Sequence, residues 1–580
     1  MEFRIDDKFY LDGKEVKIIS GAIHYFRSLP ESWEDKIIKL KAMGANCVET
    51  CIAWNLHEPY EGKWTFEGHL NLPYFIELAT KHDLMIMVRF GPYMCGEHDY
   101  GAFPWWLNNK KDIKFRCDNE VFLEETRKYT NKMVEILAPY CASNGGNIIL
   151  CQLENEYGSY GNDKAYLKKL LNIIREAGFK DDIITSDGSW HTMLEGGTLL
   201  DEGILPTVNF GSKANEHFDV LEKFIGKDKP LMCMEYWCGW FNAWKSEKII
   251  TTDPKVAAVE LDEILKRGSV NIYMFHGGTN WGAQAGANQS IENGYTPDIT
   301  SYDYDALLDE RGNITQKYRE CKKVISKYVD IPEIEITNIP STTYLDINYI
   351  GSANIFGNDS FEKINKAHPL TMESLGFGFG YVLYETCLDY LEKINSIQLK
   401  GMNDRALVFL DEKLVLEVFK EEHKMFKLDK KIRKKTKLSI LVENTGRVNY
   451  GPMMENQVKG IDGGVFINNH FFQFGWDNIK LPLEYKLFEG LTYNKKILNK
   501  PQIHKYNMCI DKSENIYDTF LNMEEFGKGY VYVNGFNIGR FWQVGPQYKL
   551  FLPSQLLKYG ANEILIIESD GIVGNLKSEK

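Results

Sequence analysis

The sequence predicts a multidomain chain in which a (β/α)8 TIM barrel is followed by two all-β sandwich domains. Three observations predict this fold class. The chain has 580 residues, too many for one hydrophobic core. Short apolar segments alternate with amphipathic ones over residues 1–329. Beyond that point strand-like segments and turn dipeptides dominate, as is typical of β-sandwiches.

The first region contains eight short segments that are rich in Ile, Val and Met. They lie near Lys17–Tyr25, Cys47–Asn55, Met85–Pro92, Asn147–Glu156, Ile183–Asp187, Thr207–Gly211, Leu231–Trp237 and Val270–Gly277. The amphipathic segments predicted as helices include Trp33–Met43, Val121–Leu137, Ala165–Ala177 and Pro254–Arg267. Eight such units fit a closed parallel barrel. A doubly wound open sheet is the alternative, but no GxGxxG motif follows the first strand.

Local signals predict where two of these helices begin. Ser32, followed by Asp35, has the pattern of an N-cap with an acidic first turn. Pro254 suits the first turn of its helix, where a missing backbone N–H costs nothing.

Two stretches of the later region echo each other. Ala406–Val415 and Tyr530–Ile538 each predict a strand, a tight turn and a second strand, and the latter contains the hairpin dipeptide Asn534-Gly535. The segment Asp330–Pro340 has the composition of a linker. We therefore expect a catalytic barrel over 1–329, a linker and first β-sandwich over 330–485, and a second β-sandwich over 486–580.

Charge and composition exclude several classes of function. The net charge is −13 and the pI is about 5.6, which argues against nucleic acid or an anionic membrane as partner. The sequence has neither a run of 18 apolar residues nor a signal peptide at its start. The eleven cysteines form no CxxC pair and predict reduced thiols, so we expect a cytoplasmic protein.

Two of the apolar segments carry a glutamate followed at once by a tyrosine. One reads NIILCQLENEYG and ends around Glu156, and the other reads PLMCMEYW and contains Glu235. Because the carboxyl ends of barrel strands share one face, we expect these two side chains to meet. Hydrolysis of a glycosidic bond needs such a pair of carboxyl groups. Asn155 would contact a sugar hydroxyl beside Glu156 if the strand ends there with a bulge.

Three tryptophans follow Glu235 closely. Trp237, Trp240 and Trp244 favour a platform on which sugar rings stack, although tryptophans that merely fill the barrel rim would give the same pattern.

A glycine-rich loop after the third strand contains a further acid. Glu97 could accept hydrogen bonds from sugar hydroxyls. Glu97, His98 and Asp99 could also be metal ligands, but adjacent residues rarely converge on one ion. We expect no metal and no cofactor.

Together these residues resemble glycoside hydrolase family 35, the β-galactosidases in which a TIM barrel is followed by jelly-roll, galactose-binding-like domains. The resemblance runs nearly end to end. Its motifs are SGAIHYFR (Ser20–Arg27), WNLHEP (Trp54–Pro59), GPYMCGE (Gly91–Glu97), QLENEYGSYG (Gln152–Gly161), TSDG (Thr185–Gly188), NFGSK (Asn209–Lys213), MEYWCGW (Met234–Trp240), FHGGTN (Phe275–Asn280), TSYDYDA (Thr300–Ala306), GRVNYG (Gly446–Gly451) and GKGYVYVNGFNIGRFW (Gly527–Trp542). The chain is most similar to the short, signal-less bacterial members, some of which favour galactose linked β-1,3 to N-acetylhexosamine.

The resemblance implies a retaining exo-β-galactosidase that acts on terminal β-D-galactosyl residues of an oligosaccharide or glycan end. It implies that Glu156 is the acid/base and Glu235 the nucleophile, with carboxyls about 5–5.5 Å apart. The residues that it assigns to galactose binding are Cys95, Gly96, Glu97, Asn155 and Tyr304. Tyr450 joins the stacking candidates if a β-domain loop reaches the barrel mouth. The sandwich domains offer surfaces for a homodimer.

The chain departs from the family pattern at three points. Cys51 stands where many members have a galactose-contacting tyrosine, His98 replaces a tryptophan, and Ala102-Phe103 replace Gly-Leu. Two rival hypotheses stay open at this point: a non-catalytic sugar-binding protein, and a barrel glycosidase of another specificity, such as an exo-β-glucosaminidase or a β-glucosidase. A third rival, a scaffold protein assembled through its sandwiches, has no positive sign in the sequence.

Overall fold

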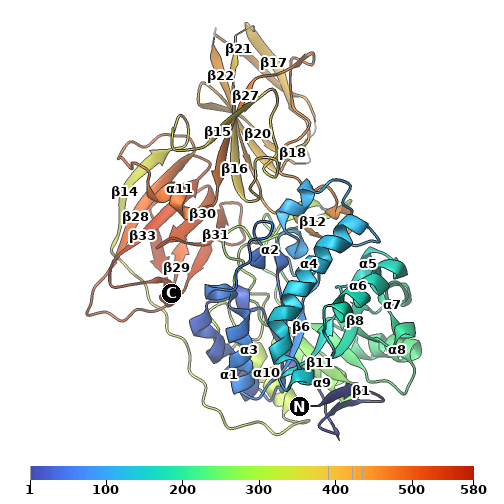
Figure 1. Ribbon diagram of the computed structural model, residues 1–580. Helices are drawn as coiled ribbons and strands as arrows, with labels where there is room; N and C mark the ends of the chain where they lie inside the picture. Colours follow the sequence, from blue (N-terminus) through green and yellow to red (C-terminus); the bar gives the residue numbers. More distant parts are fainter. Residues whose placement is uncertain (1, 390, 421, 423, 434) are drawn as a thin grey trace.

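The computed structural model describes residues 2–580 except 390, 421, 423 and 434, and it contains a closed barrel and two β-sandwiches (Figure 1). The barrel, blue to green in Figure 1, lies below the first β-domain and beside the second. The predicted fold class is confirmed.

Eight parallel strands close the barrel in the order of the chain. They are β4 (Ile19–Ile23), β5 (Cys47–Cys51), β6 (Met85–Arg89), β7 (Ile148–Gln152), β8 (Asp182–Gly188), β9 (Leu205–Phe210), β10 (Met232–Trp237) and β11 (Ser269–His276). All eight predicted strands are present. Their nearly continuous apolar runs suit strands that are covered on both faces.

Helices cover the outside of the barrel. The main ones are α1 (Trp33–Ala42), α3 (Leu72–Lys81), α4 (Glu120–Leu137), α6 (Lys164–Glu176), α7 (His191–Gly197), α8 (Ala214–Ile225), α9 (Pro254–Arg267) and α10 (Gln316–Ile325). Pro254 begins α9 as predicted, and Asp253 caps it by accepting from the N–H of Lys255. Ser32 stands at the N-cap position of α1 and Asp35 lies in its first turn, as predicted, but the Ser32 hydroxyl donates to the carbonyl of Leu29 and makes no capping bond.

The first β-domain packs a six-stranded sheet against a four-stranded sheet. The larger sheet contains β15 (Lys363–Lys366), β27 (Trp476–Pro482), β16 (Gly380–Leu388), β22 (Thr436–Glu443), β19 (Arg405–Leu410) and β20 (Lys413–Phe419). The smaller one contains β21 (Phe426–Lys431), β17 (Lys393–Leu399), β25 (Val465–Ile467) and β26 (Phe471–Phe472). The hairpin predicted over Ala406–Val415 is formed by β19 and β20.

The second β-domain packs a five-stranded sheet against a three-stranded sheet. The larger sheet contains β14 (Ile347–Asn354), β28 (Gln502–Ile510), β33 (Gly560–Glu568), β30 (Lys528–Val533) and β31 (Phe536–Trp542). The smaller one contains β32 (Lys549–Leu552), β29 (Thr519–Asn522) and β34 (Lys577–Glu579). Asn534-Gly535 forms the turn between β30 and β31, as predicted.

One strand crosses the division that the sequence suggested. β14 lies within 330–485, yet it pairs with β28 of the second β-domain. The chain therefore enters the second β-domain first, builds the first β-domain, and then returns. Non-local pairing of this kind leaves no signal in a local sequence pattern.

A small sheet joins the first β-domain to the mouth of the barrel. The barrel hairpin β12 (Ala287–Ser290) and β13 (Gly294–Pro297) pairs in parallel with β23 (Val448–Tyr450), which comes from a loop of the first β-domain. This pairing brings Tyr450 to the face where the barrel strands end.

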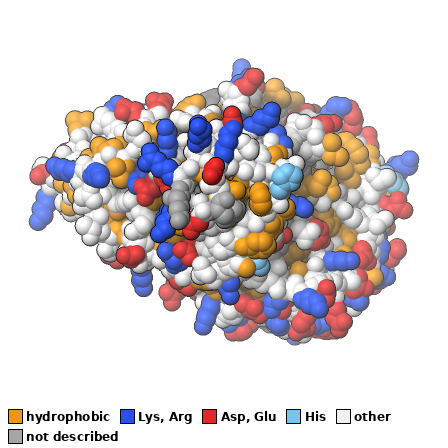
Figure 2. All heavy atoms as spheres, turned by 90° about the horizontal axis from the view of Figure 1, so that it is seen from above, with side chains coloured by type: hydrophobic (Ala, Val, Ile, Leu, Met, Phe, Trp, Pro, Cys, Tyr) orange, Lys and Arg blue, Asp and Glu red, His pale blue; other side chains and the backbone are white. Residues whose placement is uncertain are grey.

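The molecular surface carries both signs of charge. Figure 2 shows Lys and Arg side chains interspersed with Asp and Glu on the face seen from above. Within the residues that the structure describes, no helix combines the length and the apolar character needed to cross a membrane.

Candidate active site

Glu235 lies in β10, two residues before the end of the strand. The pairing of β10 with both neighbouring strands shifts register between Cys233 and Tyr236, so a bulge re-aims the side chain here. Its Oε1 accepts from Arg89 Nη2 at 2.5 Å, and its Oε2 accepts from Trp237 Nε1 at 2.9 Å. A guanidinium and an indole offer only N–H groups, so Glu235 is the acceptor in both bonds.

Glu156 is held in a different way. β7 ends at Gln152, four residues earlier, and Glu156 sits in a left-handed backbone conformation (φ +46°) ahead of the short helix α5 (Tyr157–Tyr160). The prediction that Glu156 ends the strand is therefore wrong. Its Oε1 accepts from Asn209 Nδ2 at 3.0 Å, and Asn209 in turn is the register partner of Glu235 between β9 and β10.

Arg89, at the end of β6, connects the two halves of the site. Besides Glu235, its guanidinium donates to Oδ1 of Asn155, the residue before Glu156. Gln152 Nε2 also donates to Asn155 Oδ1, at 2.9 Å. The side chain of Asn155 is thus oriented by two donors.

The environment of Glu156 changes its charge. Burial and, second, the negative charge of Glu235 raise its pKa to about 8, while the hydrogen bond from Asn209 acts in the opposite direction. A pKa near 8 favours the protonated form of Glu156 at neutral pH, beside the hydrogen-bonded Glu235.

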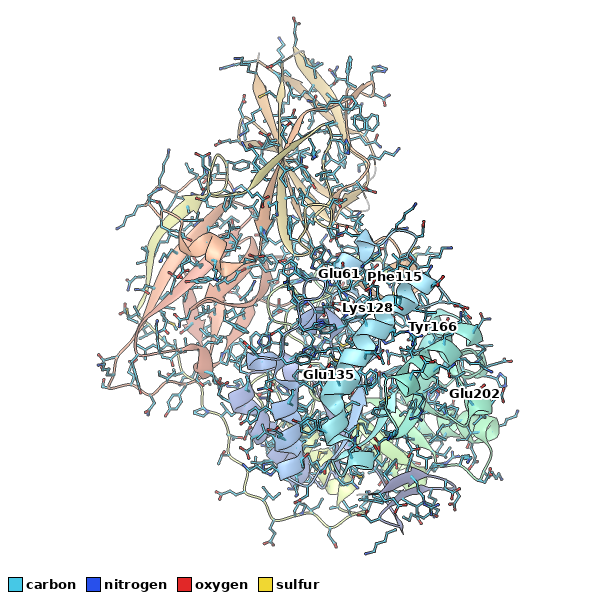
Figure 3. All side chains as sticks on the ribbon, in the orientation of Figure 1. Glu61, Phe115, Lys128, Glu135, Tyr166 and Glu202 are labelled. Atoms are coloured by element: carbon cyan, nitrogen blue, oxygen red, sulfur yellow. The ribbon has the colours of Figure 1, made fainter. Side chains whose placement is uncertain are left out.

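Glu154 has no part in this pair. Its carboxylate accepts from Arg116 Nε at 2.9 Å and Nη2 at 2.8 Å, and from the hydroxyl of Tyr166 at 3.0 Å. Tyr166 lies on α6, where Figure 3 labels it. The bidentate pair is buried, so Glu154 is a structural residue.

Glu97 lies in the predicted loop after β6 and is 8% exposed. It accepts from the hydroxyl of Tyr302, and Cys95 Sγ lies 3.9 Å from its Oε1. Burial raises the pKa of Glu97 to about 7. The carbonyl of Gly96 accepts from the guanidinium of Arg27.

Aromatic side chains form one wall of the site. Tyr304 packs edge-on against Tyr273 with ring centroids 5.5 Å apart, and its ring centre lies 6.4 Å from that of Trp240. Trp240 contacts Trp237 edge-on at 5.4 Å and is 36% exposed, so one ring remains open to a ligand. These contacts bring Trp237, Trp240 and Tyr304 together, as expected of a stacking surface.

Tyr450 reaches this site from the first β-domain. It is 38% exposed, and burial followed by the charge of Glu156 raises its pKa to about 12. Tyr450 was expected to contact a sugar only if a β-domain loop reaches the barrel mouth. The strand β23 meets this condition.

One cluster has the donor atoms that a metal ion could use. His24, Glu49 and Cys51 place one such atom each within 4.8 Å of one another. However, Arg27 Nη1 lies 2.8 Å from His24 Nδ1, and Arg89 Nε lies 3.8 Å from Glu49 Oε1, so an ion there would face two guanidinium groups.

The comparisons with known proteins decide the family. A family model described as "Glycosyl hydrolases family 35" matches residues 8–328. Models described as "Beta-galactosidase, first all-beta domain" and "Beta-galactosidase, galactose-binding domain" match residues 369–482 and 501–562. The chain belongs to glycosyl hydrolase family 35. It is therefore a glycoside hydrolase.

Relatives of this family 35 hydrolase match it over nearly its whole length. "Beta-galactosidase 17" of Arabidopsis thaliana is 37% identical and covers 97% of this chain and 86% of its own. "Beta-galactosidase" of Xanthomonas manihotis is 36% identical over 94% of this chain and 90% of its own. "Beta-galactosidase 1" of Dictyostelium discoideum is 33% identical over 96% and 89%.

Trp244 of this hydrolase lies away from the aromatic wall, against the prediction. It is 2% exposed and packs on Trp542 of the second β-domain with ring centroids 6.3 Å apart. Neither face is free for a sugar. The close spacing of the three tryptophans suggested one stacking surface. Spacing alone cannot distinguish a tryptophan ring that is exposed from one that a distant domain covers.

All the residues that depart from the family pattern, Cys51, His98, Ala102 and Phe103, are buried. Cys51 Sγ lies 3.7 Å from Glu49 Oε1, below Arg89. His98 Nε2 shares a hydrogen bond of 3.0 Å with Asn55 Oδ1. Glu97, His98 and Asp99 each turn to a different partner, so they do not converge on one ion.

Sequence reasoning missed Arg89, Tyr273 and the role of Asn209. Tyr273 lies inside β11, three residues before its end, but Arg89 and Asn209 had a weak signal, namely a polar side chain at or next to the carboxyl end of an otherwise apolar strand. In a barrel these are the positions that face the active site.

Proposed function

We propose that the protein is a retaining β-galactosidase that removes terminal β-D-galactosyl residues from oligosaccharides or glycan ends. One observation carries the mechanism: two neighbouring glutamates have different hydrogen-bond donors, a guanidinium for Glu235 and a neutral amide for Glu156. Glu235 accepts hydrogen bonds from Arg89 and Trp237, whereas burial and the charge of Glu235 keep Glu156 protonated. A nucleophile and an acid are thus supplied together.

The reaction then proceeds by double displacement. Glu235 attacks the anomeric carbon while the glycosidic C–O bond breaks, and Glu156 gives its proton to the leaving oxygen. The galactosyl ester neutralises Glu235, and the pKa of Glu156 falls because the neighbouring charge is gone. Glu156 then takes a proton from water, which attacks the anomeric carbon and releases Glu235 as a carboxylate.

Galactose specificity rests on two supports. The relatives named above are called β-galactosidases. Of the positions expected to hold galactose, Cys95 interacts electrostatically with Glu156, and Glu97 and Tyr304 interact with Glu235. Glu97 is a buried acceptor that binds the hydroxyl of Tyr302. The same carboxyl group can also accept a hydrogen bond from a sugar hydroxyl. We propose that Glu97 accepts hydrogen bonds from hydroxyls of the galactosyl ring.

The decisive experiment separates nucleophile from acid/base. Glu235→Ala should abolish turnover of an aryl β-galactoside, and added azide should restore formation of an α-galactosyl azide. Glu154→Gln is a matched control, because this carboxyl lies in the same segment but is paired with Arg116. Near-wild-type turnover by Glu235→Ala, or a β-azide product, would contradict the mechanism.

We further propose a preference for galactose linked β-1,3 to N-acetylhexosamine. Its support is the resemblance to short bacterial family members, and the exposed ring of Trp240 beside the pair offers a surface for the second sugar. Hydrolysis rates of galactosyl-β-1,3- and β-1,4-N-acetylglucosamine should differ by tenfold or more. Equal rates would contradict the preference.

We also propose that the protein works in a reducing compartment such as the cytoplasm. All eleven cysteines are free thiols in the structure, and nine of them belong to buried or partly buried barrel segments. Titration of the unfolded protein with a thiol reagent, after isolation under non-reducing conditions, should count eleven thiols. A lower count would argue for an oxidising compartment.

A further inference from the structure

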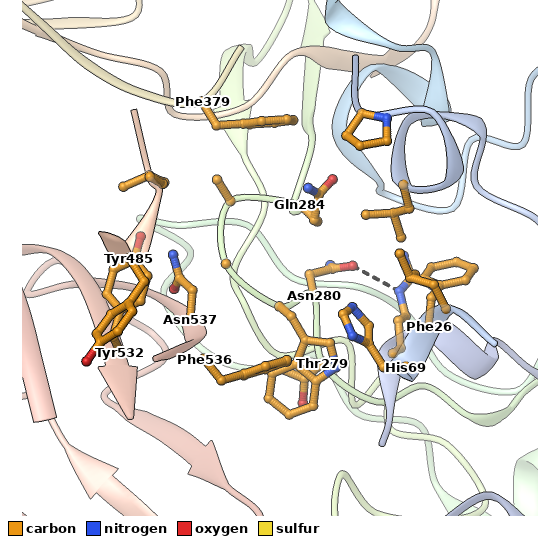
Figure 4. Close-up of a pocket in the computed structure, with 18 of the residues that line it drawn as sticks. Phe26, His69, Thr279, Asn280, Gln284, Phe379, Tyr485, Tyr532, Phe536 and Asn537 are labelled. Carbon is orange, nitrogen blue, oxygen red and sulfur yellow. Dashed lines mark hydrogen bonds between the residues drawn. The ribbon is translucent and has the colours of Figure 1, made fainter. Parts of the chain in front are cut away.

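A pocket of about 400 Å³ lies between the barrel and both β-domains (Figure 4). We call it the interdomain pocket and define it by His69, Gln284, Phe379, Tyr485, Phe536 and Asn537. His69 and Gln284 come from the barrel. Phe379 directly precedes β16 of the first β-domain. Tyr485 begins α11 (Tyr485–Glu489), which follows β27, and Phe536 and Asn537 come from the β30–β31 hairpin. The pocket exists only because three parts of the chain meet.

This pocket is separate from the glutamate pair. Neither Glu156, Glu235 nor Tyr304 is among the described residues that line it. Arg27 and His98 belong to its wall and face other partners. The Arg27 guanidinium lies 3.6 Å from the centre of the Tyr302 ring, on the side of the active site.

Aromatic rings bound the pocket on several sides. Phe379 and Phe536 lie on opposite sides of it in Figure 4, and Tyr485 lies between them at one end. Phe536 is fixed edge-on by Trp281, with centroids 5.4 Å apart, and by His69, at 5.5 Å. Rings held in this way present flat faces, whose negative quadrupole attracts the C–H groups of a sugar.

The polar groups of the pocket have unused hydrogen-bonding capacity. Gln284 Oε1 accepts from Asn55 at 3.1 Å, but its Nε2 meets no partner among the described residues. His69 forms no hydrogen bond with any described residue, and burial lowers its pKa to about 4, so its neutral ring offers one donor and one acceptor. The Nδ2 of Asn280 is buried and likewise without a partner in the described chain.

The pocket offers no free charge. Arg27 is the one ionised side chain among the described residues that line it. Its guanidinium is occupied by Asn280 Oδ1 at 2.9 Å, by His24 Nδ1 at 2.8 Å and by the carbonyl of Gly96. Phosphates, carboxylates and ammonium groups would therefore enter without a counter-charge, at a large desolvation cost.

We propose that the interdomain pocket is a second sugar site, which binds a neutral saccharide independently of catalysis. Amide and imidazole groups both donate and accept, as hydroxyl groups require, and the rings supply the apolar contact. The volume falls in the range of ligand pockets, roughly 300–1,000 Å³, and suits one or two hexose units. Such a site would hold a second part of a glycan while the barrel cleaves its end.

The first test uses the unsubstituted full chain. Crystals soaked separately in galactose, glucose, mannose and N-acetylglucosamine should show at least one sugar between Phe379 and Phe536, with a hydroxyl on Gln284 Nε2. Water alone in the pocket in all four soaks, with galactose present beside Glu235, would overturn the proposal. Galactose in neither place would instead count against the proposed function.

The second test works in solution, by calorimetry with the same four sugars. It uses the Glu97→Ala chain, which removes an acceptor from the active site and so lowers binding there. Adding Phe536→Ala should weaken the remaining binding at least tenfold, whereas adding Tyr559→Ala, on an exposed ring of the same domain, should leave it unchanged. Equal affinity in both double variants would overturn the site.

A third measurement separates this site from catalysis and from misfolding. Phe536→Ala alone should hydrolyse an aryl β-galactoside within about twofold of wild type, since the ring lines a pocket to which neither glutamate contributes. A parallel fall in turnover and in Tm would mean that Phe536 only supports the fold, and would overturn its role as a sugar contact.

Discussion

Arg447 should connect the first β-domain to the sugar-binding loop, and replacing it by methionine should break that connection. The side chain is fully buried just before β23. Its Nη1 donates to Asp99 Oδ2 at 3.1 Å, its backbone N–H to Asp99 Oδ1 at 2.6 Å, and its Nη2 to Glu373 Oε1 at 2.6 Å. Asp99 lies two residues from Glu97. The first β-domain therefore holds the loop that carries Glu97, the expected galactose contact.

The loop needs these contacts with Arg447 because its backbone is strained. Cys95, Glu97, Tyr100 and Ala102 have φ values of +59°, +48°, +58° and +75°. Conformations of this kind cost on the order of 1–3 kcal/mol each and persist only when surrounding contacts hold them. Without Arg447, the carboxylates of Asp99 and Glu373 would stay buried without a counter-charge, a loss of about 3–5 kcal/mol. Relaxation of the loop is the way to relieve both costs.

The assay is a double-mutant cycle on kcat/KM with an aryl β-galactoside. Arg447→Met should raise KM more than it lowers kcat, because Glu97 would lose its position while the glutamate pair is untouched. Adding Asp99→Asn should cost little more, since the residue at position 99 then carries no charge that has lost its partner, giving a coupling energy of about 0.5–3 kcal/mol.

The matched control is Lys459→Met. Lys459 is a buried cation of the same β-domain, but its ammonium binds Asp404 at 2.7 Å and does not contact the loop. It should lower Tm and leave KM unchanged. The reasoning would be refuted by additive losses in the Arg447 and Asp99 variants, or by an equal rise of KM in Lys459→Met.

Three further predictions concern the glutamate pair and its surroundings. Because Glu156 must be protonated, kcat/KM should fall as pH rises through about 8, and its pKa, followed by NMR of labelled glutamate, should drop in Glu235→Gln. Asn209→Ala removes a bond that lowers the pKa of Glu156, so the alkaline limit should move upward; a downward shift would contradict the assignment. Trp244→Phe should lower Tm with KM unchanged, whereas Trp240→Ala should raise KM for a disaccharide; the opposite pattern would place the sugar elsewhere.

The barrel was predictable because the composition of its strands is easy to recognise in the sequence. Runs such as Met85–Arg89 are buried on both faces, so composition alone marks them, and parallel order then places their carboxyl ends on one face. That geometry also predicted that Glu156 and Glu235 would come near each other, although they lie far apart in the sequence.

Other features could not be predicted because they depend on distant parts of the chain. The pairing of β14 with β28, the cover that Trp542 places over Trp244, and the approach of Tyr450 all result from domains folding back on the barrel. The turn at Glu156 is local, but left-handed glutamates have no sequence signal, since their strain is compensated by tertiary contacts.

The division of labour between the two glutamates shows what only three dimensions can supply. Glu156 and Glu235 are the same residue type, and each is followed by a tyrosine after an apolar run, so no sequence pattern distinguishes acid from nucleophile. Arg89 accounts for the difference between the two glutamates. Its guanidinium donates directly to Glu235, but toward Glu156 it donates only to the neutral amide of the neighbouring Asn155. One carboxyl thus receives a full positive charge and the other receives an amide hydrogen from Asn209. If Arg89→Met left the alkaline limit of activity in place, this account of the asymmetry would fail, because loss of the cation should raise the pKa of Glu156 further.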